Sequence, residues 1–450
     1  MRTTRPRDPE PITVLDLFSG CGGFTQGFHE FRPAEAADGG PVFHSIAAVE
    51  HDTAAAATYA ANFGSRRRDE RIPPARIHLE NIEDWHPTPD ELSADVVVGG
   101  PPCQGFSALN RVKKGTERNR LWEEFVRIVA KVRPKIFVIE NVDRFLKSDE
   151  FVNLLNEVGC GGLLGDYQLV DPPGHEQTDT AEQKIKRYLL NAADYGAVQA
   201  RRRAIVIGVR KDVTNGRTMK YPTATHVRRS QRIGSLPIEP LDGITPELPY
   251  WRAVDSVFQE SSQMTLRGTE LPDSKEDVTD VNARVLGIFT TSELHFGRNP
   301  EPLSIARYKA IPPGGNRKDL QGKWFTVTDD GDIAIFPEKN PHGVKTKVSY
   351  LSTESWDNHN SGSGDVMGRV RLGAPSVTIR TEFFKPEKGR YLHPTEPRPI
   401  THYEAARIQG FPRDFRWCGS KTDIARQIGN AVPIPLGKAI ASTIHTFLRG

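Results

Sequence analysis

The sequence predicts an α/β fold, with a doubly wound, mostly parallel sheet and a second, smaller, loop-rich domain. Three observations support this fold class. The first 210 residues alternate short apolar runs with helical patterns, which is typical of strand–helix units. From about residue 211 the periodicity fades, and Pro, Gly, Ser and charged residues dominate. The length of 450 residues also exceeds what one ordinary core supports.

Six short apolar runs are the expected strands, at residues 12–17, 45–49, 77–79, 95–98, 135–139 and 204–209. The run at 95–98 contains three consecutive valines, which suit a strand covered on both faces. Helices are expected at 53–62, 121–131, 401–409 and within 423–448. In the second of these, Leu121, Phe125 and Ile128 fall on one helical face.

The composition indicates a globular enzyme of the cytoplasm. The net charge is +3, with 37% apolar and 26% charged residues. Four scattered cysteines show no spacing typical of zinc ligands, so no metal site is expected, and they suit a reducing compartment. No signal peptide is evident, and no apolar run approaches the roughly 20 residues of a membrane span, so no membrane association is expected.

A glycine-rich turn follows the first expected strand. Gly20, Gly22 and Gly23 would let a ligand approach the backbone closely and would open a helix N-terminus. Glu50 ends the second strand, where an acid can accept hydrogen bonds from both hydroxyls of a ribose. These two features predict a nucleotide-like ligand at the carboxyl ends of the strands.

A cysteine stands on a stiff turn at the end of the fourth strand. Two glycines and two prolines lead into Cys103, and this lead-in fixes the backbone before the thiol. An isolated cysteine is more often a small buried hydrophobe. The rigid presentation favours a nucleophile instead. Glu140 ends the next apolar strand, and a poorly solvated carboxyl there suits a general acid.

Residues 95–107, DVVVGGPPCQGFS, resemble the nucleophile loop of the DNA (cytosine-5)-methyltransferase family. Other motifs of that family follow in order, at 140–142 (ENV), 199–203 (QARRR), 398–412 and 427–433 (QIGNAVP). The resemblance covers residues 12–210 and 397–450. Each motif alone is modest, and their joint order carries the assignment.

The resemblance implies a Rossmann-like, S-adenosylmethionine-dependent methyltransferase domain at 10–210 plus 424–450. It also implies a target-recognition domain at 211–423, including a hinge motif near 398–412. The implied cofactor-binding residues are Phe18 on the adenine, Ser19, Gly20, Gly22, Gly23, Glu50 on the ribose, Asn81, Ile82, Pro101, Leu121, Asn430 and Val432. The family usually has Asp at the position of Asn81, and an Asn oxygen can still accept from the adenine amine.

The same resemblance implies covalent catalysis on a flipped cytosine. Cys103 would add to C6 and Glu140 would act at N3. Arg203 would contact O2, and Arg201 would contact a phosphate or the catalytic loop. Residues 104–121 would form a loop that closes over DNA and excludes water.

The predicted function is therefore DNA (cytosine-5)-methylation of double-stranded DNA by a monomer with no obligatory protein partner, as in prokaryotic restriction-modification systems. Thr378-Ile379 resembles the short threonine element of recognition domains. Two alternatives remain. The related tRNA-methylating branch is disfavoured because the 211–396 region is too large for it. A catalytically inactive DNA-binding homologue is disfavoured by the intact Cys103, Glu140 and Arg203.

Overall fold

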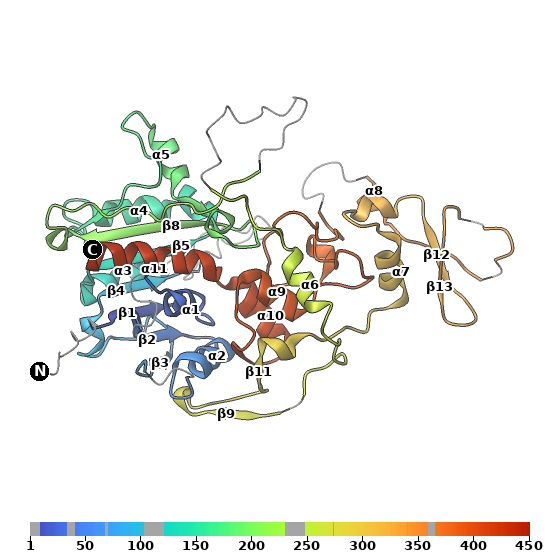
Figure 1. Ribbon diagram of the computed structural model, residues 1–450, viewed down its shortest axis with the longest axis horizontal. Helices are drawn as coiled ribbons and strands as arrows, with labels where there is room; N and C mark the ends of the chain where they lie inside the picture. The colour runs from blue at the N-terminus through green and yellow to red at the C-terminus, as the bar shows by residue number, and fades with distance from the viewer. Residues whose placement is uncertain are drawn as a thin grey trace, which may run out of the picture.

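The computed structural model describes residues 10–33, 41–67, 71–102, 121–229, 248–272, 274–339, 341–344, 346–358 and 365–450. It confirms the predicted α/β class. An eight-stranded sheet has the order β3-β2-β1-β4-β5-β8-β6, with β7 paired to β8. The molecule is elongated, with this sheet at one end and the hairpin of β12 and β13 at the other (Figure 1).

Five strands of the sheet run parallel, in the order β3-β2-β1-β4-β5. They are β1 (Ile12–Leu17), β2 (Phe43–Glu50), β3 (Arg76–Leu79), β4 (Val96–Gly99) and β5 (Ile136–Asn141). The antiparallel β8 (Arg202–Arg210) then pairs with β5, β6 (Tyr167–Leu169) and β7 (Leu189–Asn191). All six predicted strands are present. The short strands β6 and β7 were not predicted.

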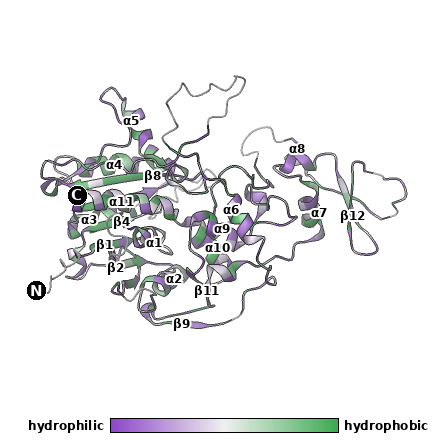
Figure 2. Cartoon of the chain, in the orientation of Figure 1, coloured by the Kyte–Doolittle hydropathy of each residue, from purple (hydrophilic) through white to green (hydrophobic). Residues whose placement is uncertain are grey.

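The central strands are buried along their whole length. Every residue of β4 and β5 is buried, as expected for parallel strands covered by helices on both faces. Figure 2 shows β4 and β8 coloured hydrophobic, whereas the peripheral helices α5 (Ala181–Arg187) and α8 (Glu354–Asp357) are hydrophilic. The sheet therefore forms the main core.

Helices cover the sheet on its two faces. The right-handed crossover rule puts α1 (Gly23–Glu30) and α2 (Thr53–Phe63) on one face and α3 (Leu121–Val132) on the other. The closing segment forms two helices, α10 (Lys421–Asn430) and α11 (Ile434–Arg449), separated at Pro433. Helix α11 packs against α1, so the end of the chain returns to the sheet (Figure 1). Helix α4 (Asp149–Val158) follows β5.

The remaining elements lie outside the main sheet and its covering helices. They are α6 (Asp255–Ser261), α7 (Pro302–Ala310), α9 (His402–Gln409), β9 (Glu276–Val278), β10 (Ala283–Val285), β11 (Ile288–Thr290), β12 (Trp324–Val327), β13 (Ile333–Phe336), β14 (Ser349–Tyr350) and β15 (Arg416–Cys418). The helices are short, and the strands pair only in twos and threes, as a loop-rich region predicts.

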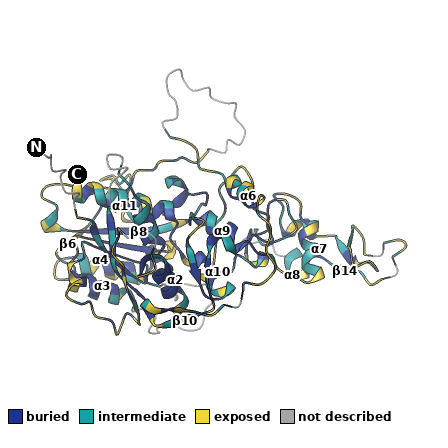
Figure 3. Cartoon of the chain, turned by 60° about the horizontal axis from the view of Figure 1, so that its bottom comes forward, coloured by how far each residue is buried: buried dark blue, intermediate teal, exposed yellow. Residues whose placement is uncertain are grey.

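Two further hydrophobic clusters support these elements. The larger one joins α2 to α9, α10 and β15, and the smaller one lies under α7 and β12. In Figure 3 the sheet and the helices α2 and α9 are mostly buried, whereas α6, α7 and α8 carry exposed residues. The larger cluster crosses the predicted boundary at residue 211, and the exact domain division stays a prediction. In the described part of the chain, no helix has the length and apolar character that crossing a membrane requires.

Candidate active site

A cavity of about 490 Å³ opens at the carboxyl ends of the parallel strands. This is the edge where open α/β sheets bind ligands, and the volume suits a small-molecule cofactor. Most predicted site residues line it, namely Phe18, Ser19, Gly20, Gly23, Glu50, Pro101, Glu140, Arg201, Arg203, Asn430 and Val432. Gly22, Asn81, Ile82 and Leu121 are not among its lining residues.

The glycine-rich turn is tightly constrained. Phe18 has a φ of 53°, a left-handed conformation that costs roughly 1–2 kcal/mol for a residue with a side chain. A Cβ on Gly23 would lie 2.8 Å from the carbonyl oxygen of Val432. Glycine is needed there because the last motif packs directly on the turn. Ser19 Oγ is buried beside the cavity with no hydrogen-bond partner among the described residues.

Glu50 lines the cavity and binds the backbone of two neighbouring turns. Its two carboxylate oxygens accept hydrogen bonds from the backbone N–H groups of Gly20 and Asp52, both at 2.8 Å. A carboxylate has about four acceptor sites, so capacity remains for a ligand hydroxyl. Asp16 lines the same cavity; burial raises its pKa to about 7, opposed by a hydrogen bond from Thr25.

Asn81 and Ile82, two of the predicted cofactor-binding residues, lie away from the cavity wall. Asn81 is exposed, and its side-chain N–H donates to Glu83 Oε2 at 2.8 Å. Ile82 is buried in the core beside Trp85. The structure therefore does not bring Asn81 to the cavity wall, and its predicted contact with adenine remains a prediction.

Glu140 and Arg203 meet in the cavity. Arg203 Nε lies 2.7 Å from Glu140 Oε1, and both side chains are largely buried. A Cβ on Gly100 would lie 3.0 Å from Glu140 Oε2. The glycine therefore makes room for the carboxylate, a role that the sequence alone did not reveal. Strand β5 positions Glu140 and the antiparallel β8 positions Arg203, which explains how residues 63 positions apart become partners.

Asn141 connects this pair to the predicted nucleophile loop. Its side-chain N–H donates to the carbonyl oxygen of Pro101 at 2.9 Å, and its side-chain oxygen accepts from the N–H of Val142. Sequence reasoning included Asn141 in a motif but gave it no role. Cys103 and the loop up to residue 120 lie outside the described residues, so the chain is placed up to Pro102.

Arg201 is buried beside the cavity. Its terminal nitrogens donate to the carbonyl oxygens of Ile379 at 2.7 Å and Gly429 at 2.8 Å. Burial, together with the charge of Arg203, lowers the pKa of Arg201. Each terminal nitrogen thus donates to a backbone carbonyl oxygen, and the predicted contact of Arg201 with a phosphate or with the catalytic loop stays a prediction.

The threonine element lies against the same arginine segment. Ala200 N–H donates to the carbonyl oxygen of Ser376 at 2.8 Å, and Thr378 Oγ1 donates to the carbonyl oxygen of Ala200 at 3.3 Å. The segments around 199 and 376 form a short parallel bridge. The predicted recognition region therefore contacts the site through backbone pairing.

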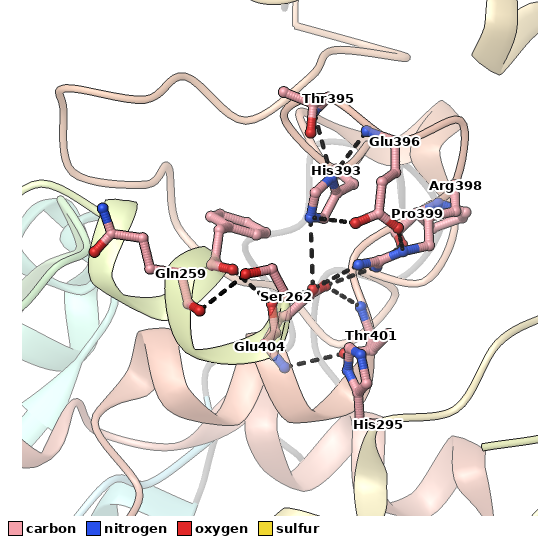
Figure 4. Close-up of polar contacts among 12 residues, drawn as sticks. Gln259, Ser262, His295, His393, Thr395, Glu396, Arg398, Pro399, Thr401 and Glu404 are labelled. Carbon is pink, nitrogen blue, oxygen red and sulfur yellow. Dashed lines mark hydrogen bonds and ion pairs between the residues drawn. The ribbon is translucent and has the colours of Figure 1, made fainter. Parts of the chain in front are cut away.

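The hinge motif is built on a buried carboxylate (Figure 4). Glu404, fully buried, accepts from both terminal nitrogens of Arg398 at 2.8 and 3.0 Å. It also accepts from Thr401 N–H at 2.8 Å and from Ser261 Oγ at 2.9 Å. This network fixes the start of α9 against α6.

Comparisons with known proteins identify the family. The family model for C-5 cytosine-specific DNA methylase matches residues 12–446. The Type II methyltransferase M.AgeI of Thalassovita gelatinovora is 29% identical over 470 residues, covering 96% of this chain and 99% of that protein. M.XorII, a Type II methyltransferase of Xanthomonas oryzae pv. oryzae, is 29% identical, covering 97% of this chain and 85% of its own length.

Longer relatives match over only part of their length. DNA (cytosine-5)-methyltransferase PliMCI of Paracentrotus lividus is 26% identical over 97% of this chain, which spans 28% of that protein. Among solved structures, a prophage-encoded protein of E. coli, described as a DNA modification methyltransferase, has a TM-score of 0.55. It is 21% identical and covers 98% of this chain and 100% of its own, which supports the fold.

Proposed function

Because the chain belongs to the C-5 cytosine-specific DNA methylase family, we propose that it transfers a methyl group to C5 of cytosine within a specific double-stranded DNA sequence. The observation that carries the proposal is the cavity itself. One space is lined by the glycine turn, by Glu50, by Pro101 at the start of the nucleophile loop, and by the Glu140–Arg203 pair.

We propose S-adenosylmethionine as the cofactor, and the lining residues fit it. Glu50 retains acceptor capacity for a ribose hydroxyl, and Phe18 offers an aromatic ring at the cavity wall. Ser19 offers a buried hydroxyl that has no hydrogen-bond partner among the described residues. Asn430 and Val432 close the other side. When bound, the cofactor supplies the methyl group as an electrophile.

The chemistry follows from the reactivity of the base. Cytosine C5 is a poor nucleophile, so we propose that the Cys103 thiolate adds to C6 and makes C5 enamine-like. C5 then takes the methyl group, and loss of the C5 proton re-forms the double bond and expels the thiolate.

Glu140 would hold the proton at N3, where charge develops during the addition. Arg203, 2.7 Å from Glu140, holds that carboxyl in place and would contact O2 of the base. The addition needs a base outside the helical stack, so the target cytosine would be flipped into this cavity.

Recognition of the DNA sequence is assigned to residues 211–423. Side chains on loops of this region would read base edges in the major groove. The match to M.AgeI, a Type II methyltransferase, over 99% of its length supports a modification enzyme of a restriction-modification system. We propose further that the protein acts as a cytoplasmic monomer.

The test is methylation mapping of the genome of a bacterial host that expresses the chain, with Cys103→Ser as the control. We expect one short sequence motif carrying 5-methylcytosine only with the intact chain. Binding of S-adenosylmethionine to the purified protein is measured in parallel. A protein that binds the cofactor but leaves no DNA mark would refute the DNA proposal. Methylated cytosine in tRNA would then support the tRNA branch, and its absence the inactive homologue.

A further inference from the structure

Ile379, in the predicted recognition region, is held by both of its backbone polar groups. Its N–H donates to Gln199 Oε1 at 2.6 Å, and its carbonyl oxygen accepts from Arg201 Nη1 at 2.7 Å. All three residues are almost completely buried. Hydrogen bonds shielded from water in this way are costly to leave unmade, so the position of Ile379 depends on where Gln199 and Arg201 are placed.

The hydrogen bond from Ile379 to Gln199 is the first connection between the recognition region and α10, and it continues through a pair of buried side-chain amides. Gln199 Nε2 donates to Gln409 Oε1 at 2.8 Å, and Gln409 Nε2 donates to the carbonyl oxygen of Ile428 at 2.6 Å. Both glutamines are fully buried. A chain of side-chain amides therefore joins Ile379 to the last turn of α10.

The second connection is Arg201 alone. Its Nη2 donates to the carbonyl oxygen of Gly429 at 2.8 Å, next to the residue that Gln409 contacts. At Gly429 the backbones themselves touch, because a Cβ there would lie 2.3 Å from the backbone nitrogen of Thr381. Two side-chain connections and one backbone contact thus join the recognition segment 376–381 to the segment 428–432.

Segment 428–432 also forms a wall of the cofactor cavity. Gly429, Asn430, Ala431 and Val432 all line it. Two of these lining residues are also acceptors, because the carbonyl oxygen of Gly429 accepts from Arg201 Nη2 at 2.8 Å and that of Ala431 accepts from Gln409 Nε2 at 3.4 Å.

We propose that Gln409 is a positioning residue that couples occupation of the cofactor cavity to the ordering of recognition segment 376–381. Cofactor binding fixes segment 428–432, and the Gln409–Gln199 amide pair passes that constraint to Ile379. By thermodynamic linkage, the coupling is reciprocal, and DNA bound to the ordered segment tightens cofactor binding by the same factor. The inference rests on the proposed function, because it takes S-adenosylmethionine as the occupant.

The test is hydrogen exchange of the backbone amides in residues 376–381, measured by mass spectrometry with and without saturating S-adenosylhomocysteine. In the unmodified protein we expect the ligand to slow exchange of these amides by about fivefold or more, the lower end of typical coupling between sites. In Gln409→Met, which keeps the length of the side chain but removes both amide bonds, the ligand should still bind and the slowing should largely disappear.

Ser261→Ala is the matched control. It removes a buried hydrogen bond to Glu404, which lies on α9 like Gln409, but it leaves the Gln409–Gln199 pair intact. It should keep the ligand-dependent slowing. If Gln409→Met fails to fold, Gln199→Met tests the same pair.

The outcomes separate the two proposals. Failure of the unmodified protein to bind S-adenosylhomocysteine in calorimetry would refute the proposed cofactor. Binding without slowed exchange in the unmodified protein would overturn the coupling, as would full slowing in Gln409→Met.

Discussion

Glu404→Gln is expected to destabilise the protein by about 3–5 kcal/mol, the range for removing one partner of a buried ion pair. The estimate follows from the geometry in Figure 4. The Glu404 side chain is 0% exposed and its partner Arg398 is 16% exposed, so neither charge is well solvated. Glu404 accepts four hydrogen bonds. A glutamine would replace one carboxylate oxygen by an NH2 group, which cannot accept hydrogen bonds from these donors.

Glu396→Gln is the matched control. Glu396 also pairs with Arg398, at 2.7 Å, but its side chain is 45% exposed. An exposed pair contributes about 1 kcal/mol or less, so this change should have a small effect.

The assay is equilibrium unfolding in urea at pH 7, followed by tryptophan fluorescence. Burial alone would raise the pKa of Glu404, but the hydrogen bonds and charge of Arg398 lower it below its usual value. The stabilisation is therefore complete above the unfolded pKa and is lost only as pH falls through the folded value. At pH 7 a loss for Glu404→Gln no larger than that for Glu396→Gln would refute the reasoning.

Three further outcomes are expected. Gly100→Ala places a Cβ 3.0 Å from Glu140 Oε2 and should slow single-turnover methylation by roughly 10-fold without loss of folding. The reason is that a small displacement of a reacting group lowers the rate strongly. An unchanged rate would exclude this packing role. Asn141→Ala removes the bond to Pro101 and should slow the same step while calorimetry finds cofactor affinity kept; reduced affinity with an unchanged rate would contradict it. Burial lowers the pKa of His402 to about 4, so the free energy of unfolding should fall by about 3 kcal/mol between pH 6.5 and 4. His402→Gln, which cannot titrate, should reduce this pH dependence, as measured by urea unfolding. An unaltered pH dependence would assign the acid sensitivity to other groups.

The sequence by itself determined the local features of this protein. The valines at 96–98 favour a strand covered on both faces, and the glycines and prolines at 99–102 favour a stiff turn. The strand ends therefore predicted where Glu50 and Glu140 would lie, because parallel strands end at one edge of the sheet. The order of the motifs supplied the family.

Only the tertiary structure decided which distant groups meet. The antiparallel register of β8 brings Arg203 to Glu140, and the fold buries Arg201 against Ile379 and Gly429. The same packing leaves Asn81 outside the cavity wall and makes Gln409 part of a buried amide pair. No local pattern encodes these contacts, because they depend on how segments up to 228 residues apart pack together. Packing buries the polar groups of those segments, and buried polar groups then need hydrogen-bond partners from one another.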